Sequence, residues 1–169
     1  MNRKAEIERK TRETAVTVAI SLDGKGQADI STGIPFFDHM LTLFAVHGFF
    51  DLRLRARGDI EIDSHHTVED VGIVMGDLIE TALGERSGIR RYGYAVTPMD
   101  DALAMVAVDL SRRPYLVFQV PAGETAERSF NRSLAKEFFK SIANHGGMNL
   151  HVNVPYGENE HHILEAVFK

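Results

Sequence analysis

The sequence contains neither cysteine nor tryptophan, and it has no long apolar run. Without cysteine, disulfides, iron–sulfur clusters and thiolate zinc sites are excluded, so that histidine and carboxylate side chains remain as metal ligands. No stretch of 18 apolar residues occurs, and the opening segment MNRKAEIERKTRETAV lacks the apolar centre of a secretory signal. We therefore expect a cytoplasmic protein that does not enter a membrane.

Basic residues are in the minority. The chain has 19 Lys and Arg residues against 24 Asp and Glu residues, which leaves a formal charge of -5. This balance gives no general reason to expect binding to nucleic acid or to an acidic membrane. The rest of the composition, 44% hydrophobic and 25% charged in 169 residues, is that of an ordinary globular chain. Any anion site must therefore be built locally.

An unusual pentapeptide pattern is present twice. His-His-x-x-Glu stands at residues 65–69 and again at 161–165. The two copies supply four imidazoles and two carboxylates, which is close to what two transition-metal ions need. One copy alone is more often a solvated or capping histidine pair than a metal site. Two copies in equivalent structural positions favour a metal site.

The repeat extends over the whole chain. Apolar periodicity predicts, in the first half, strands at 14–22 and 27–32, a helix at 36–47, a strand at 51–55 and a helix at 65–83. The corresponding elements of the second half are strands at 102–110 and 115–120, a helix at 134–145, a strand at 148–154 and a helix from 161. We expect the turn at 23–26 to join the first two strands as a hairpin, 115–120 to partner 102–110, and Ser64 and Asn159 to cap the motif helices.

These elements predict an α+β fold. It is a tandem duplication of a β-β-α-β-α unit, with two small sheets and their helices packed together as one domain over residues 1–169. The two pseudo-repeats cover about 1–90 and about 91–169. The second motif helix has few residues before Lys169, and the logic of the repeat predicts roughly ten or more further helical residues. We therefore expect a C-terminally truncated chain.

Aligning the two halves adds candidate metal ligands. With Gly48 set on Gly146, His39 aligns with Glu137, so a metal-capable side chain occupies this helix position in both copies. Residues four apart share a helix face, whereas adjacent residues diverge by about 100°. Under a pseudo-twofold axis, one ion would take His39, His66, His161 and Glu165, and the other His65, Glu69, Glu137 and His162. Each ion would keep open positions for substrate.

Other polar residues have simpler explanations. His47 and His145 end their helices, where a cation favours the C-terminal dipole. We interpret Asp63, Asp70 and Asp77 as residues that serve the start of the 65–83 helix and its exposed face.

Six segments carry a resemblance to a known family. They are PFFDHML (35–41), DSHHTVEDVGI (63–73), RYG (91–93), PMDDALA (98–104), DLSRRPYLVF (109–118) and ENEHHILEAVFK (158–169). Together they closely resemble imidazoleglycerol-phosphate dehydratase over nearly the whole chain. The resemblance implies a ribosomal protein S5 domain 2-like fold. It also implies a metal-dependent hydro-lyase of histidine biosynthesis, which converts D-erythro-1-(imidazol-4-yl)glycerol 3-phosphate to 3-(imidazol-4-yl)-2-oxopropyl phosphate and water.

The same resemblance implies cofactors, partners and residue roles. The expected cofactors are two Mn²⁺ per active site, and the expected assembly is a homo-oligomer of trimers forming a 24-mer with active sites between subunits. Glu13 is implied as the proton-transfer base, although by itself it would be interpreted as an exposed charge before a strand. The imidazole-bearing phosphate substrate is expected to contact Glu13, Arg91, Arg113 and Lys169. Glu137 departs from the family, where many relatives carry histidine.

Two other classes of function use the same residue types. A di-metal hydrolase would employ a metal-bound hydroxide as nucleophile, and it would release phosphate instead of removing water from imidazoleglycerol phosphate. A non-catalytic metal-binding shell protein would lose no function on substitution of Glu13. Neither class explains why two arginines and a base accompany the repeat.

Overall fold

The computed structural model describes residues 3–122 and 129–169 of the chain. The elements of the first half are β1 (Lys4–Lys10), β2 (Thr14–Ser21), β3 (Ala28–Ser31), α1 (Pro35–Gly48), β4 (Asp51–Gly58) and α2 (His65–Leu83). Those of the second half are β5 (Tyr92–Met99), β6 (Ala102–Asp109), β7 (Tyr115–Gln119), α3 (Arg132–His145), β8 (Asn149–Tyr156) and α4 (Glu160–Phe168). The α+β class and the duplication are confirmed, with one strand more per half than we predicted.

The additional strands are β1 and β5, which lie at the edges of their sheets. Each forms an antiparallel hairpin with the next strand, so the sheet orders are β1-β2-β4-β3 and β5-β6-β8-β7. In β1 only Ala5 and Ile7 are uncharged, and β5 is largely exposed and contains Pro98. Such composition is common at sheet edges and gives little apolar signal.

The predicted pairing of the next two strands in each half is wrong. β3 pairs in parallel with β4, and β7 pairs in parallel with β8, so the turn at 23–26 does not close a hairpin. The reason is the crossover through α1 or α3, which carries the chain over the sheet and returns it parallel to the strand it left. β4 and β8 therefore insert between the strands that are neighbours in sequence.

One of the two predicted helix caps is confirmed. The Asn159 side chain accepts a hydrogen bond from the His161 backbone N–H at 2.8 Å. Ser64 makes no capping bond, because its backbone is already helical (φ -76°, ψ -7°). At that helix the Asp63 carboxylate accepts from the His65 N–H instead, at 3.1 Å.

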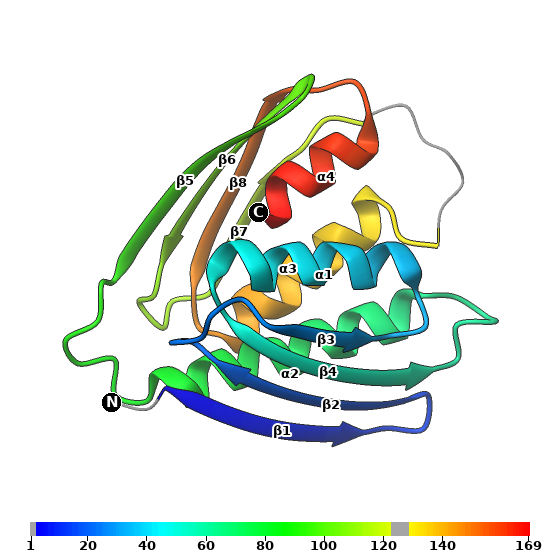
Figure 1. Ribbon diagram of the computed structural model, residues 1–169, viewed down its shortest axis with the longest axis vertical. Helices are drawn as coiled ribbons and strands as arrows, with labels where there is room; N and C mark the ends of the chain where they lie inside the picture. Colours follow the sequence, from blue (N-terminus) through cyan, green and yellow to red (C-terminus); the bar gives the residue numbers. More distant parts are fainter. Residues whose placement is uncertain (1–2, 123–128) are drawn as a thin grey trace.

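The helices form a layer between the two sheets (Figure 1). α1 and α2 pack on the first sheet and α3 and α4 on the second, while α2 contacts α3 and α1 contacts α4 across the layer. α2 and α3 approach closely because glycines face the contact: a Cβ at Gly76 would lie 2.6 Å from the Cβ of His145. No helix within the described ranges is long and apolar enough to cross a membrane.

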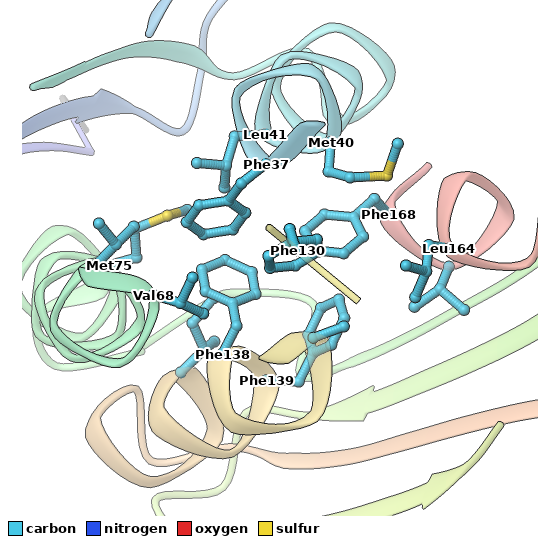
Figure 2. Close-up of a cluster of buried hydrophobic side chains, with 14 of the residues drawn as sticks. Phe37, Met40, Leu41, Val68, Met75, Phe130, Phe138, Phe139, Leu164 and Phe168 are labelled. Atoms are coloured by element: carbon cyan, nitrogen blue, oxygen red, sulfur yellow. The ribbon is translucent and has the colours of Figure 1, made fainter. Parts of the chain in front are cut away.

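Aromatic side chains join the two halves into one core (Figure 2). Phe37 of α1 stacks on Phe130 with ring centroids 4.6 Å apart, and it meets Phe138 of α3 edge to face at 5.1 Å. Phe138 in turn stacks on Phe168 of α4 at 5.5 Å. Because aromatic packing of this kind is specific in geometry, it fixes α1 relative to α4. That contact determines which histidines meet.

Candidate active site

Three predicted ligands meet where α1 crosses α4. His161 and Glu165 lie one turn apart on α4, and His39 comes from α1. His161 Nε2 is 2.9 Å from Glu165 Oε2, and His39 Nε2 is 3.5 Å from the same oxygen. One ligand atom from each of the three lies within 4.8 Å of the others. Two imidazoles and a carboxylate at this spacing fit part of the shell of a transition-metal ion.

Glu165 is held in place from its other side. Its side chain is largely buried, and Lys169 Nζ lies 2.7 Å from Oε1. Burial acts to raise the pKa of the Glu165 carboxyl, but hydrogen bonds from Lys169 and His161 outweigh it and hold the pKa below its ordinary value. Glu165 is therefore an anion with Oε2 directed at the two histidines.

The first motif forms two separate contacts on α2. His65 Nε2 lies 3.6 Å from Glu69 Oε2, one turn along the helix. His66 Nδ1 lies 3.0 Å from Asp59 Oδ2, in the loop that follows β4. The hydrogen bond to Asp59 is the main cause that raises the pKa of His66, and the charge of Glu13 adds to it. Glu13, in the turn between β1 and β2, is thus an electrostatic neighbour of the first motif.

In the second motif a carboxylate also holds the second histidine, but it comes from a different turn. His162 Nδ1 hydrogen-bonds Asp101 Oδ1, and Asp101 Oδ2 accepts the backbone N–H groups of Glu158 and Asn159. Asp101 occupies the turn before β6 as Glu13 occupies the turn before β2. A histidine whose Nδ1 is held by a carboxylate presents Nε2 to a metal in a defined direction.

Substituting Asp101 by asparagine is expected to lower the pKa of His162 toward its ordinary value in metal-free protein. The hydrogen bond from Asp101 is the largest cause that raises this pKa, and the Asp101 charge adds to it. Because the pKa in the folded protein is raised, the pair stabilises metal-free protein below a pH of about 6.5, and the stabilisation is lost as the pH rises through the raised pKa. Titration of the His162 imidazole by NMR measures the shift.

The matched control is Asp29→Asn, which removes an exposed ion pair with Arg55 and should leave the pKa of His162 unchanged. An unchanged pKa of His162 in the Asp101→Asn variant would contradict the role of Asp101.

The remaining predicted ligand lies apart from these groups. Glu137 Oε2, on α3, lies 3.2 Å from Lys140 Nζ. Within residues 3–122 and 129–169, His39, His161 and Glu165 form the only group of three or more potential ligands. A single chain thus brings three of the eight candidate ligands together.

The two candidate phosphate-binding arginines meet at the far end of the second sheet. Arg91 donates to both oxygens of Asp109 at 2.6 and 3.0 Å, and Arg113 Nη2 lies 3.8 Å from Oδ2 of the same residue. Asp109 is the last residue of β6, whereas Asp101 immediately precedes that strand. A strand of this length separates the two ends by about 23 Å. Figure 1 shows α4 beginning near the start of β6, while β6 ends at the opposite end of the sheet.

Several residues of the site were missed from the sequence. Neither Asp59 nor Asp109 carries a local motif: the loop after β4 brings Asp59 to His66, and the pairing of β5 with β6 brings Asp109 to Arg91. Our interpretation of Asp70 as part of an exposed helix face is wrong, since it is only 8% exposed. The reason is that β1, which we did not predict, packs with β2 over α2 and covers that face.

Comparisons with known proteins agree with this architecture. A family model described as imidazoleglycerol-phosphate dehydratase matches residues 32–169. The imidazoleglycerol-phosphate dehydratases of Desulfosudis oleivorans and Acetivibrio thermocellus are 62% and 56% identical to this chain over 169 residues. In both comparisons the match covers 100% of this chain and 87% of the relative.

Solved structures of the same enzyme have the same fold. The crystal structure of imidazoleglycerol-phosphate dehydratase from Staphylococcus aureus aligns with a TM-score of 0.87 and 36% identity, covering 98% of this chain and 92% of that one. The Pyrococcus furiosus structure aligns with a TM-score of 0.85 and 40% identity, covering 96% and 87%.

The duplicated fold and its doubled motif, together with these likenesses, define an enzyme of the hydro-lyase class. The chain belongs to the imidazoleglycerol-phosphate dehydratase family, and its reaction is the loss of water from imidazoleglycerol phosphate in histidine biosynthesis. The resemblance stated from the sequence is therefore confirmed. The hydrolase and the non-catalytic shell protein are set aside.

Proposed function

We propose that dehydration takes place at a site built from more than one chain, where one subunit supplies metal ligands and another supplies the arginines for the substrate phosphate. The observation that carries this proposal is the separation of about 23 Å between the two ends of β6. The glycerol phosphate arm of the substrate reaches roughly 8 Å from ring to phosphorus. One molecule of substrate therefore does not span both groups of residues in a single chain.

The metal shells of the proposal are those expected from the repeat, completed across subunits. His39, His161 and Glu165 form part of one shell, with His66 as its fourth ligand, and the second shell consists of His65, Glu69, Glu137 and His162. Nitrogen and carboxylate donors in this mixture suit Mn²⁺. When bound, two such ions would hold the two nitrogens of the substrate imidazole and let the ring accept electron density from the neighbouring carbon.

Glu13 is the base of the proposed reaction. Its carboxylate takes the proton from the middle glycerol carbon, and the hydroxyl beside the imidazole takes up a proton from solvent and leaves as water. The resulting enol becomes the ketone of the product when its hydroxyl proton is lost and the carbon beside the imidazole gains one. The exposed position of Glu13 and its influence on the pKa of His66 support this role. Arg91 and Arg113 would exchange their contacts with Asp109 for the phosphate, because a guanidinium fork matches its oxygens.

Lys169 and the assembly complete the proposal. Lys169 contacts Glu165 in the isolated chain, and its ammonium would add positive charge beside the substrate. The oligomer is proposed to be a homo-oligomer of trimers forming a 24-mer, and its location the cytoplasm, where its reaction in amino-acid biosynthesis would occur.

Mixing two inactive variants tests whether the site lies between subunits. The Arg91→Ala and His161→Ala variants are each expected to be inactive, and a one-to-one mixture dissociated and reassembled with Mn²⁺ should recover about a quarter of the parent activity. The recovered sites combine an intact His161 from one subunit with an intact Arg91 from another. Activity that stays at the level of the separate variants would contradict the proposal. A mixture of His161→Ala with His162→Ala chains is the comparison, because it measures how much activity is recovered when both substitutions lie on the same helix.

A further inference from the structure

Asp70 is a buried carboxylate that directly follows the first metal-binding motif. It lies on α2 next to Glu69, and its side chain contacts the hairpin of β1 and β2. Arg9 Nε of β1 donates to Oδ1 at 2.8 Å, and the Thr14 hydroxyl of β2 donates to Oδ2. Removing a carboxylate from water is costly unless such partners are present, so a polar group at this place requires a reason.

The contacts continue from Asp70 to the backbone of Glu13. Since a carboxylate only accepts, the Thr14 hydroxyl donates to Asp70, and the Thr11 hydroxyl, 3.1 Å away, then donates to Thr14. Thr11 Oγ1 in turn accepts the backbone N–H groups of Glu13 and Thr14 at 3.2 and 3.0 Å. The direction of every hydrogen bond is thus determined, from the Glu13 backbone to the helix that carries His65, His66 and Glu69.

The second half of the chain shows that the fold does not need these polar groups. The last strand pair before the turn is Lys10 with Ala15 in the first hairpin and is aligned with Pro98 and Leu103 in the second. In this alignment Thr14 corresponds to Ala102 and Arg9 to Thr97. The second motif lies 96 residues after the first, so Asp70 corresponds to Ala166.

Of the three equivalent positions in the second half, the two that replace Thr14 and Asp70 are apolar and buried, and the third, Thr97, is uncharged. Ala102 is 2% exposed and Ala166 is fully buried. At these positions an equivalent helix therefore packs on an equivalent hairpin without a charged side chain. Hydrophobic contact would serve stability at least as well in the first half.

We propose that Asp70 is a positioning residue that holds the turn of Glu13 at a set place relative to the metal-binding start of α2. The inference rests on the role of Glu13 proposed above. A base must lie within hydrogen-bond reach of the proton it removes, and a displacement of about 1 Å can lower the rate about 100-fold. In the second half the turn carries Asp101, which His162 and two backbone N–H groups hold directly, so no second anchor is needed there.

The Asp70→Asn variant tests the role of the carboxylate with little change of shape. The amide of asparagine has only one acceptor oxygen, and its nitrogen only donates. It therefore cannot accept from Arg9 and Thr14 on two separate atoms, and the turn loses one hydrogen bond. We expect kcat to fall about 10- to 100-fold, KM to change less than about threefold, and the manganese content to equal that of the parent. The matched control is Asp29→Asn, which removes an exposed ion pair with Arg55 and should leave kcat unchanged.

A double-mutant cycle with Glu13 separates positioning from a general structural effect. If Asp70 acts through Glu13, adding Asp70→Asn to a Glu13→Gln enzyme should leave the residual rate unchanged. A further 10-fold loss in that background would overturn the proposal. If instead Glu13→Gln alone retains the parent rate, the proposed function of Glu13 fails, and this result is distinct from a failure at Asp70.

A variant that copies the second half guards against loss of folding. The triple variant Arg9→Thr, Thr14→Ala, Asp70→Ala installs residues already compatible with this packing, and it should keep the parent's thermal unfolding temperature within a few degrees. We expect it to assemble, to bind manganese and to show the same selective loss of kcat. A kcat within twofold of the parent, in either this variant or Asp70→Asn, would overturn the inference.

Discussion

Replacing Glu13 with glutamine is expected to lower kcat by about 10²- to 10⁴-fold, the usual contribution of a general base, while the manganese content stays at the level of the parent enzyme. The amide keeps the shape of the side chain but cannot take a proton. Glu13 is exposed in its turn and is held through its backbone, so the substitution leaves the hydrogen bonds of Thr11 in place. Steady-state kinetics with imidazoleglycerol phosphate, combined with metal analysis, measures both quantities.

A suitable control for this experiment is Glu8→Gln on β1. Glu8 is also exposed, and its strand partner is Thr17 on β2. We expect kcat to remain at the parent value in this control. A Glu13→Gln enzyme that turns over normally would exclude Glu13 as the base.

If the proposed metal shells are correct, replacing His161 with alanine is expected to reduce the bound metal from the proposed two ions per chain to about one and to lower activity more than about 10³-fold. His161 Nε2 lies 2.9 Å from Glu165 Oε2 and shares the cluster with His39. The proposed shell takes three of its ligands from α1 and α4. Without the imidazole of His161, the ion keeps too few protein ligands to stay bound. Elemental analysis after dialysis against a weak chelator, with native mass measurement of the assembly, provides the test.

His151→Ala is the matched substitution, because His151 is an exposed histidine on a strand and lies outside the ligand cluster. It should leave metal content, assembly and activity unchanged. Two ions per chain in His161→Ala enzyme would show that the cluster at α1 and α4 is not a metal shell.

The candidate metal ligands could be found from the sequence because the duplication is visible in it. His65 and Glu69 share a helix face by spacing alone, and the structure has them one turn apart at 3.6 Å. His39 was found only by aligning the halves, and it lies with His161 and Glu165. Local periodicity and internal repetition are sufficient for such predictions, since both are properties of neighbouring or equivalent positions.

Strand pairing could not be predicted in the same way. The turn at 23–26 suggested a hairpin, but β4 returns through α1 and inserts beside β2. Pairing depends on whether β3 or β4 packs more favourably beside β2, and the residues of β2 and β3 alone do not show which of them does. The edge strand β1 was missed for a related reason, because its alternating charges suit an edge exposed to water.

The sequence by itself determined the family, the duplicated α+β architecture and the residue types available for metal, base and phosphate, since motifs and periodicity are written in local order. Only the tertiary structure decided what those residues touch. It placed Arg91 and Asp109 together at the opposite end of β6 from His162, and it buried Asp70 beneath β1, a strand that was not predicted from the sequence. Contacts between residues far apart in the chain arise from packing of whole elements, and for this reason they become visible only when the elements are assembled.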